Sequence, residues 1–290
     1  MPDHSFEHQM ITLDCGTMIH VEYFKPDSAV EGLPFFVFVP GDELNVTVGY
    51  HLADFFSKKG HSGMLIDPPD HGLSGQCMRY PDNDYMTAAQ AEQSEIINEI
   101  VAKYCKDNLL LAGYSSGGFD VLKMAIDNPG KVSSLVLIAC AHRDPSDGDK
   151  GMVAMFDGLI EENRRQFENN GCVRKLVRFD QMPGRSMDDY IGEGHPVTGP
   201  YLARRLYASL SFDEREAIGV IRDSGIRVLA IRGDEDKFIK KHVFDEMVEL
   251  TDAECENVPG VGHYFPVQKP KLLTEKVEKH YDFLVRNQST

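Results

Sequence analysis

The sequence is short of positive charge. Its 290 residues include 30 Lys and Arg against 46 Asp and Glu, so the formal net charge at pH 7 is −16 and the pI is near 5.1. Such an excess of negative charge repels the phosphates of nucleic acids and of anionic membranes. We therefore expect no nucleic-acid partner.

Long hydrophobic runs are also lacking. The longest apolar stretches, at residues 109–112 and 135–141, have the length of a β-strand, whereas a helix needs about 20 apolar residues to cross a bilayer. Residues 1–8 are acidic and polar, unlike the basic and apolar start of a secretory signal. These features predict a cytoplasmic protein without membrane insertion.

Motifs for metals and nucleotides are missing as well. The sequence contains no H-E-x-x-H, no G-x-x-x-x-G-K-[ST] and no C-x-x-C, and the histidines are dispersed. The six cysteines stand singly, which favours reduced thiols: Cys15, Cys77, Cys105, Cys140, Cys172 and Cys255. We expect neither a metal nor a cofactor.

The residues that are present predict an α/β fold. Hydrophobic residues make up 42% of the chain, enough for a folded core, and strand-sized apolar runs alternate with helical patterns, as in a mostly parallel sheet. The predicted strands cover residues 10–13, 18–24, 34–39, 64–66, 108–112, 132–138, 227–231 and 254–258. The predicted helices cover residues 48–59, 87–105, 119–127, 241–250 and 269–285.

The alternation stops between residues 142 and 221. Gly, Asp and Arg become frequent there, and helical stretches occur without a strong strand. We predict a core formed by residues 1–141 and 222–290, with an inserted helical cap at residues 142–221.

A nucleophile motif lies between a predicted strand and a predicted helix. Gly113-Tyr114-Ser115-Ser116-Gly117 is a G-x-S-x-G sequence, a sharp turn that exposes the serine Oγ at the start of a helix. The alternative is an ordinary glycine-rich turn. A serine hydroxyl is a weak nucleophile without a base, so a functional motif predicts a histidine held by a carboxylate. Asp234, Glu235 and Asp236 follow a predicted strand, and His263 follows the last one.

With these residues in this order, the sequence resembles the α/β-hydrolase fold superfamily, in its branch of esterases, lipases and C–C bond hydrolases with a cap. The resemblance rests on five motifs, which are Val39-Pro40-Gly41-Asp42, the segment 67–74, the serine motif, Gly233-Asp234-Glu235-Asp236 and Gly262-His263. It implies an eight-stranded sheet with helices on both faces.

The resemblance also implies roles for individual residues. Ser115 is the expected nucleophile, His263 the general base and acid, and Asp236 the carboxylate, with Asp234 and Asp144 as alternatives for the acid. The expected oxyanion donors are the backbone N–H groups of Ser116 and Asp42, with Glu43 as the alternative to Asp42. The expected substrate-binding residues are Glu43, Tyr114, Met152, Met155, Phe156 and Tyr264.

Asp42 and Glu43 depart from the family pattern because they put carboxylates beside a site for negative charge. If these side chains point into the pocket, they slow acyl transfer or favour a cationic substrate. His71 is expected only to pack its loop.

The predicted function is a cofactor-free serine hydrolase that cleaves an ester or related carbonyl of a small-molecule substrate through an acyl-enzyme. The same triad also suits C–C bond hydrolysis, amide hydrolysis or acyl transfer. A different class stays open, namely a ligand-binding protein of this fold that has lost efficient catalysis.

Overall fold

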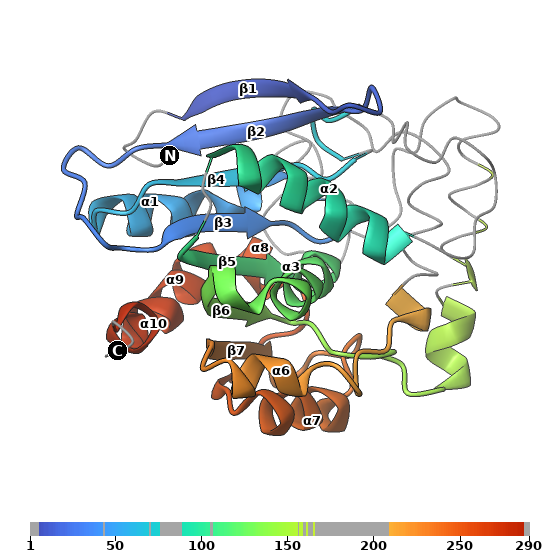
Figure 1. Ribbon diagram of the computed structural model, residues 1–290. Helices are drawn as coiled ribbons and strands as arrows, with labels where there is room; N and C mark the ends of the chain where they lie inside the picture. The colour runs from blue at the N-terminus through green and yellow to red at the C-terminus, as the bar shows by residue number, and fades with distance from the viewer. Residues whose placement is uncertain are drawn as a thin grey trace.

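An eight-stranded sheet forms the centre of the computed structural model, which describes residues 6–42, 44–69, 71–75, 89–104, 107–155, 157–158, 161, 165 and 209–286. The strand order is β1-β2-β4-β3-β5-β6-β7-β8 (Figure 1). The strands are β1 (Glu7–Thr12), β2 (Met18–Phe24), β3 (Phe35–Val39), β4 (Gly63–Ile66), β5 (Leu109–Tyr114), β6 (Val132–Ile138), β7 (Arg227–Gly233) and β8 (Glu254–Val258). β2 pairs antiparallel with β1 and β4, and the other neighbouring pairs are parallel. The predicted fold class is confirmed.

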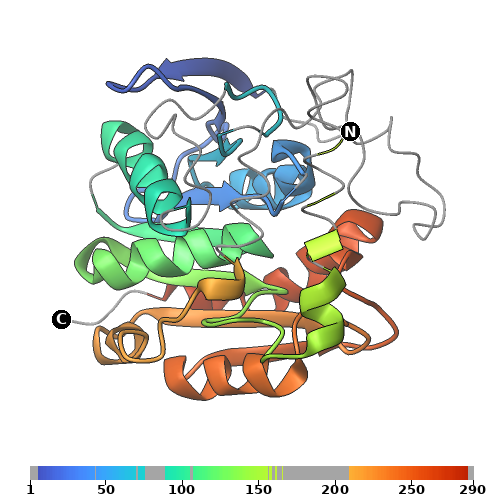
Figure 2. The same cartoon turned by 90° about the vertical axis from the view of Figure 1, so that its right-hand side faces the viewer.

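Helices cover both faces of this sheet. One layer contains α2 (Ala89–Tyr104), α3 (Ser116–Asp127), α6 (Gly219–Asp223) and α7 (Lys241–Thr251). The other contains α1 (Tyr50–Lys58), α8 (Phe265–Gln268), α9 (Pro270–Lys279) and α10 (Tyr281–Val285). In Figure 2, α2 and α3 lie on the left of the sheet and α1 lies on the right. There are also two short 3₁₀ helices, η1 (Val46–Gly49) and η2 (Pro129–Lys131), and helical segments at residues 150–155 and 209–211.

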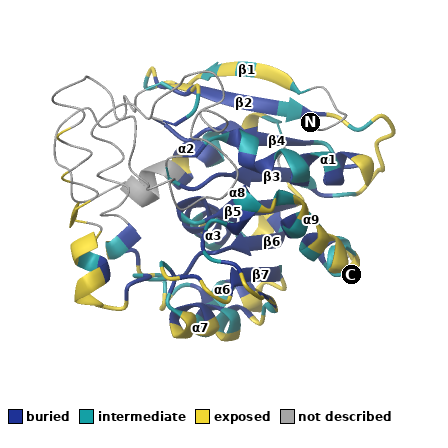
Figure 3. Ribbon diagram, turned by 180° about the vertical axis from the view of Figure 1, so that it is seen from behind, coloured by how far each residue is buried: buried dark blue, intermediate teal, exposed yellow. Residues whose placement is uncertain are grey.

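The apolar strands are buried from both sides. Leu109 and Leu111 of β5 pack in the core on the side of α3, whereas Leu110 and Ala112 pack on the side of α1. Successive side chains of a strand point to opposite faces, so a strand covered on both faces must be apolar throughout. Burying each leucine contributes about 1.5–3 kcal/mol. Figure 3 shows these central strands buried, whereas β1 at the edge is largely exposed.

The prediction of one helix over residues 269–285 is wrong, because α9 and α10 are separate helices. His280 lies between them with φ −106° and ψ 11°, outside helical geometry. Its ring Nε2 lies 2.9 Å from Glu256 Oε1, and its Nδ1 is paired with Glu254, both on β8. His280 thus contacts the edge strand where the helix breaks. The helical periodicity of the sequence did not predict this break.

α3 begins at Ser116, three residues before the predicted start. Gly117 and Gly118 have low helix propensity, but their lack of side chains is what this position requires. A Cβ on Gly118 would lie 2.5 Å from Cys140 Cβ, so only glycine lets the helix pack this closely on β6 and the loop after it.

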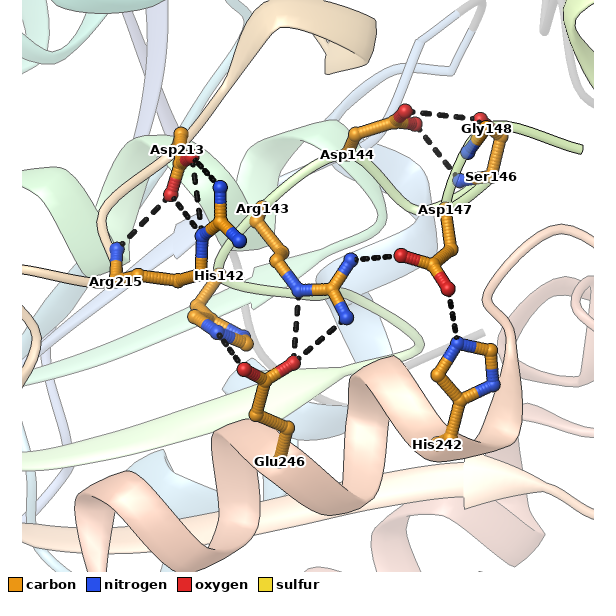
Figure 4. Close-up of polar contacts among 10 residues, drawn as sticks. All are labelled: His142, Arg143, Asp144, Ser146, Asp147, Gly148, Asp213, Arg215, His242 and Glu246. Carbon is orange, nitrogen blue, oxygen red and sulfur yellow. Dashed lines mark hydrogen bonds and ion pairs between the residues drawn. The ribbon is translucent and has the colours of Figure 1, made fainter.

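The two ends of the predicted cap segment lie side by side. Arg143 forms an isolated β-bridge with Asp213, and the Glu214 N–H donates to the His142 carbonyl at 2.9 Å. Figure 4 shows this region, where Arg143 Nε also donates to Glu246 Oε2 of α7 at 2.7 Å. The chain therefore leaves the core and re-enters it at one place. The cap itself stays a prediction, because residues 166–208 lie outside the described part of the chain.

None of the described helices combines the length and the hydrophobicity needed to span a bilayer.

Candidate active site

Ser115 occupies a strained turn between β5 and α3. Its φ of 54° and ψ of −123° are unusual for a residue with a side chain and cost about 1–3 kcal/mol. The neighbouring glycines make the turn possible. A Cβ on Gly113 would lie 2.3 Å from Gly117 O, and a Cβ on Gly117 would lie 2.3 Å from Val39 O. The G-x-S-x-G spacing therefore reflects the close approach of backbone on both sides of the serine.

Three predicted residues from distant parts of the sequence meet at this turn. Ser115 Oγ lies 3.0 Å from His263 Nε2, and His263 Nδ1 lies 2.9 Å from Asp236 Oδ2. Asp236 follows β7 and His263 follows β8, so both loops lie at the carboxyl edge of the sheet. The serine is half-buried, and the histidine and the aspartate are buried.

Asp236 fixes the protonation pattern of the histidine. Burial by itself would raise the pKa of Asp236, but the charge of His263, its hydrogen bond and two backbone N–H groups outweigh burial and lower it. Those N–H groups belong to Phe238 and Ile239 and lie 2.8 and 3.0 Å from Oδ1. An ionised Asp236 can only accept, so His263 Nδ1 carries the proton and Nε2 accepts from Ser115.

The two alternative acids bind elsewhere. Asp234 is exposed, and its Oδ1 accepts the Gly260 N–H at 2.8 Å. Asp144 accepts from Ser146 N–H at 2.8 Å and lies 3.0 Å from Ser146 Oγ (Figure 4). Of the three candidates, Asp236 is the one that contacts His263.

Aromatic rings surround the histidine. The ring centroids of Phe238, Tyr264 and Tyr114 lie 4.8, 5.4 and 5.5 Å from that of His263. Tyr114 is fully buried, and its hydroxyl donates to the His263 carbonyl at 3.0 Å. Tyr114 therefore holds the histidine loop from within the core. Phe238 was not among the site residues predicted from the sequence. The one signal that could have suggested it is its position two residues after Asp236.

The loop after β3 passes directly beside the serine. A Cβ on Gly41 would lie 2.9 Å from Ser115 Cβ, so the backbone that leads to Asp42 touches the turn. Asp42 is half-buried, and Ser116 is buried at the first position of α3. Glu43 and Phe156 lie outside the described residues. His71 is buried, and its Nδ1 donates to the Pro69 carbonyl at 2.8 Å, in keeping with a packing role.

The first described residues of the predicted cap include two candidate pocket residues. Met152 is buried, whereas Met155 is 39% exposed. Both follow Asp149, whose Oδ1 caps this turn by accepting the Met152 N–H at 3.1 Å. Their contact with substrate stays a prediction.

The same fold occurs in several solved structures. The chain is similar to E-2-(acetamidomethylene)succinate hydrolase, with 19% identity and a TM-score of 0.69, over 96% of this chain and 100% of that one. An esterase from Exiguobacterium antarcticum has 17% identity and a TM-score of 0.73, over 94% and 99% of the two chains. A hydrolase from Pseudomonas aeruginosa has 13% identity and a TM-score of 0.71, over 95% and 98%. At these identities the likeness shows the fold alone.

A search of curated proteins found no match. The profile of the alpha/beta hydrolase fold family matches residues 34–270, which span β3 to the start of α9 and include the serine turn, the Asp236 loop and His263. This family supports hydrolase activity. The chain belongs to the alpha/beta hydrolase fold family.

Proposed function

We propose that this protein is a serine hydrolase that cleaves an ester or a related carbonyl bond of a small molecule. The observation that carries the proposal is the unbroken hydrogen-bonded path from Ser115 Oγ through His263 to Asp236, at a serine held in a strained turn. Strained backbone at a half-buried hydroxyl is stabilised only by its surroundings and is typical of functional positions.

The first half of the reaction acylates the serine. His263 Nε2 accepts the hydroxyl proton as Ser115 Oγ bonds to the carbonyl carbon. The ionised Asp236 stabilises the imidazolium that results. When the tetrahedral intermediate collapses, the bond to the leaving alcohol breaks and His263 returns the proton to that alcohol. The acyl group is then bonded to Ser115.

The second half releases the acid. A water molecule gives a proton to His263 Nε2 and adds to the acyl carbonyl. The new intermediate collapses by breaking the bond to Ser115 Oγ, which takes the proton back. In each half His263 accepts one proton and returns one, so these four transfers close the cycle without a net change in the enzyme.

Backbone N–H groups of Ser116 and Asp42 are the proposed oxyanion donors. The position of Ser116 at the start of α3 and the contact of Gly41 with Ser115 support this assignment. One such donor contributes about 2.7–4 kcal/mol to the transition state. Because the side chain of Asp42 is acidic, substrates with a positive charge near the scissile carbonyl should be included among those tested.

The substrate pocket is proposed to be largely apolar. Phe238 and Tyr264 beside the histidine support this, as do Met152 and Met155 at the start of the proposed cap of residues 142–221. Esterase neighbours with the same fold make carboxylic esters the first class to try.

Labelling with a fluorophosphonate, which bonds to activated serines, tests the proposal. We expect the wild-type protein to be labelled, and Ser115→Ala and His263→Ala to lose labelling. Ser116→Ala is the matched control, because it removes a neighbouring hydroxyl and keeps the backbone N–H. A screen of short-chain aryl esters follows.

Equal labelling of wild type and Ser115→Ala would show that another residue reacts. A folded wild-type protein that neither labels nor hydrolyses any ester favours the alternative, a ligand-binding protein of this fold.

A further inference from the structure

A second group of chemically active side chains lies on the edge hairpin. In the antiparallel pairing of β1 with β2, His8 stands directly opposite Glu22. His20 precedes Glu22 by two residues and so shares its face of the strand. The three side chains meet although the histidines are dispersed in the sequence, a dispersal that predicted no metal cluster.

The separations of the three groups suit a tetrahedral metal ion. His8 Nδ1 lies 3.4 Å from His20 Nε2 and 3.3 Å from Glu22 Oε1, and His20 Nε2 lies 4.0 Å from Glu22 Oε1. Nitrogen and oxygen ligands at about 2.0–2.1 Å from zinc are about 3.3–3.4 Å apart in a tetrahedron. Two of the three separations match, and the third has to shorten as the ion binds.

Asp67 prepares His20 to act as a ligand. Its Oδ2 lies 2.7 Å from His20 Nδ1, and its carboxylate also accepts the N–H groups of Val46 at 2.8 Å and Leu73 at 3.0 Å. Such a carboxylate accepts from Nδ1–H, so His20 Nε2 keeps a lone pair that can bind an ion. A carboxylate behind a histidine is the usual second partner in metal sites, where it orients the ring and raises its basicity.

Glu22 supplies buried negative charge to the same place. Its side chain is 3% exposed, and the Tyr50 hydroxyl donates to its Oε1 at 2.8 Å. Its Oε2 is buried and has no hydrogen-bond partner among the residues that the structure describes. Burying the charge of a carboxylate is costly unless the charge is paired, so a cation bound at Oε1 offsets part of the cost of burying Glu22.

We propose that His8, His20 and Glu22 bind a divalent metal ion of the zinc type, which holds β1 against β2. The two nitrogen ligands favour zinc over magnesium or calcium, which prefer oxygen. The His8 side chain is 61% exposed, so the ion enters from solvent and keeps a fourth position for water or another ligand. This site is independent of the proposed hydrolase reaction.

Calorimetric titration with zinc chloride tests the proposal, using chelator-treated full-length protein. We expect the wild type to bind one equivalent, and His8→Ala to lower the affinity at least tenfold. His8 is exposed, so this change leaves the fold intact. Glu22→Gln is a second variant, which keeps the shape of the side chain and removes its charge. Circular dichroism checks that this variant folds. His242→Ala is the matched control, because His242 is also exposed and also paired with a carboxylate, that of Asp147.

Cobalt(II) supplies a readout of geometry. Tetrahedral coordination by the wild type gives intense visible absorption bands, which His8→Ala should lose. The proposal is overturned if the wild type does not bind zinc, or if His8→Ala and His242→Ala lose zinc affinity equally. The cluster is then a hydrogen-bonded network. Loss of fluorophosphonate labelling in Ser115→Ala bears on the hydrolase alone and does not affect this test.

Discussion

The hydroxyl of Tyr114 donates a hydrogen bond to the backbone carbonyl of His263, 3.0 Å away. Tyr114 is the residue immediately before Ser115, so the turn that carries the serine also holds the loop that carries the histidine. Burial raises the pKa of Tyr114 well above its ordinary value, with a smaller contribution from the nearby Tyr264, so the phenol stays a donor at every working pH. One side chain thus fixes the relative position of the two groups that exchange a proton.

Tyr114→Phe should therefore lower both stability and activity. Removing the donor leaves a buried carbonyl unpaired, which costs about 1–3 kcal/mol in the free energy of unfolding. We expect kcat for an aryl ester to fall by about tenfold, with KM little changed, because the histidine loop shifts while the pocket stays. Urea unfolding and steady-state kinetics measure the two effects.

Tyr281→Phe is the control for this variant. The Tyr281 hydroxyl lies 2.9 Å from His61 Nε2, in a contact between α10 and the loop after α1. It should lower stability and leave kcat unchanged. An equal loss of kcat in both variants would mean that general destabilisation, rather than the position of His263, accounts for the result.

Asp236→Asn should nearly abolish hydrolysis and leave the fold intact. The amide keeps an acceptor for the Phe238 and Ile239 N–H groups, but it favours the wrong tautomer of His263. A change of this kind lowers kcat by about 10⁴-fold in serine hydrolases. Asp234→Asn is the matched control, because its amide oxygen can still accept from Gly260. If Asp234→Asn lowers kcat as much as Asp236→Asn does, the assignment of Asp236 as the acid is contradicted.

Two substitutions at Ser115 should separate strain from chemistry. Both Ser115→Gly and Ser115→Ala remove the nucleophile, but glycine has no Cβ to clash at φ 54°. We expect Ser115→Gly to be about 1 kcal/mol more stable than Ser115→Ala. At Ser116 we expect the opposite order. Because this residue is helical, Ser116→Ala should be more stable than Ser116→Gly. Thermal unfolding of the four variants checks this, and the same order at both positions would argue against strain at Ser115.

His142 should make stability depend on pH. Its ring is fully buried, and burial lowers its pKa from 6.5 to about 4. Glu246 and Asp213 favour the protonated form, whereas Arg143 and Arg215 oppose it. Between pH 6.5 and 4, the unfolded chain binds a proton that the folded protein does not. His142 therefore lowers the free energy of unfolding as pH falls from 6.5 to 4.

His142→Leu tests this contribution, because both ring nitrogens lack hydrogen-bond partners within the described structure and leucine has a similar size. We expect the melting temperature of the variant to fall less than that of the wild type between pH 7 and pH 4.5. His242→Leu, at an exposed histidine, is the control. Parallel curves for wild type and His142→Leu would show that other groups dominate acid unfolding.

The sequence by itself determined the fold class, because strands covered on both faces have to be apolar along their whole length, as residues 109–112 are. It also singled out Ser115 and His263, since a tight turn demands glycine at Gly113 and Gly117 and since each loop directly follows a strand. These are local requirements, and local requirements can be read from neighbouring residues.

The tertiary structure alone decided which contacts form between distant residues. Asp234 and Asp236 both follow β7, yet one caps the Gly260 N–H and the other contacts His263, because the direction of each side chain depends on the backbone of its loop. The separation of α9 from α10 and the meeting of His8 with Glu22 likewise depend on strand register and helix packing. Neither leaves a periodic signal, because the partners lie far apart in the chain and meet only after it has folded.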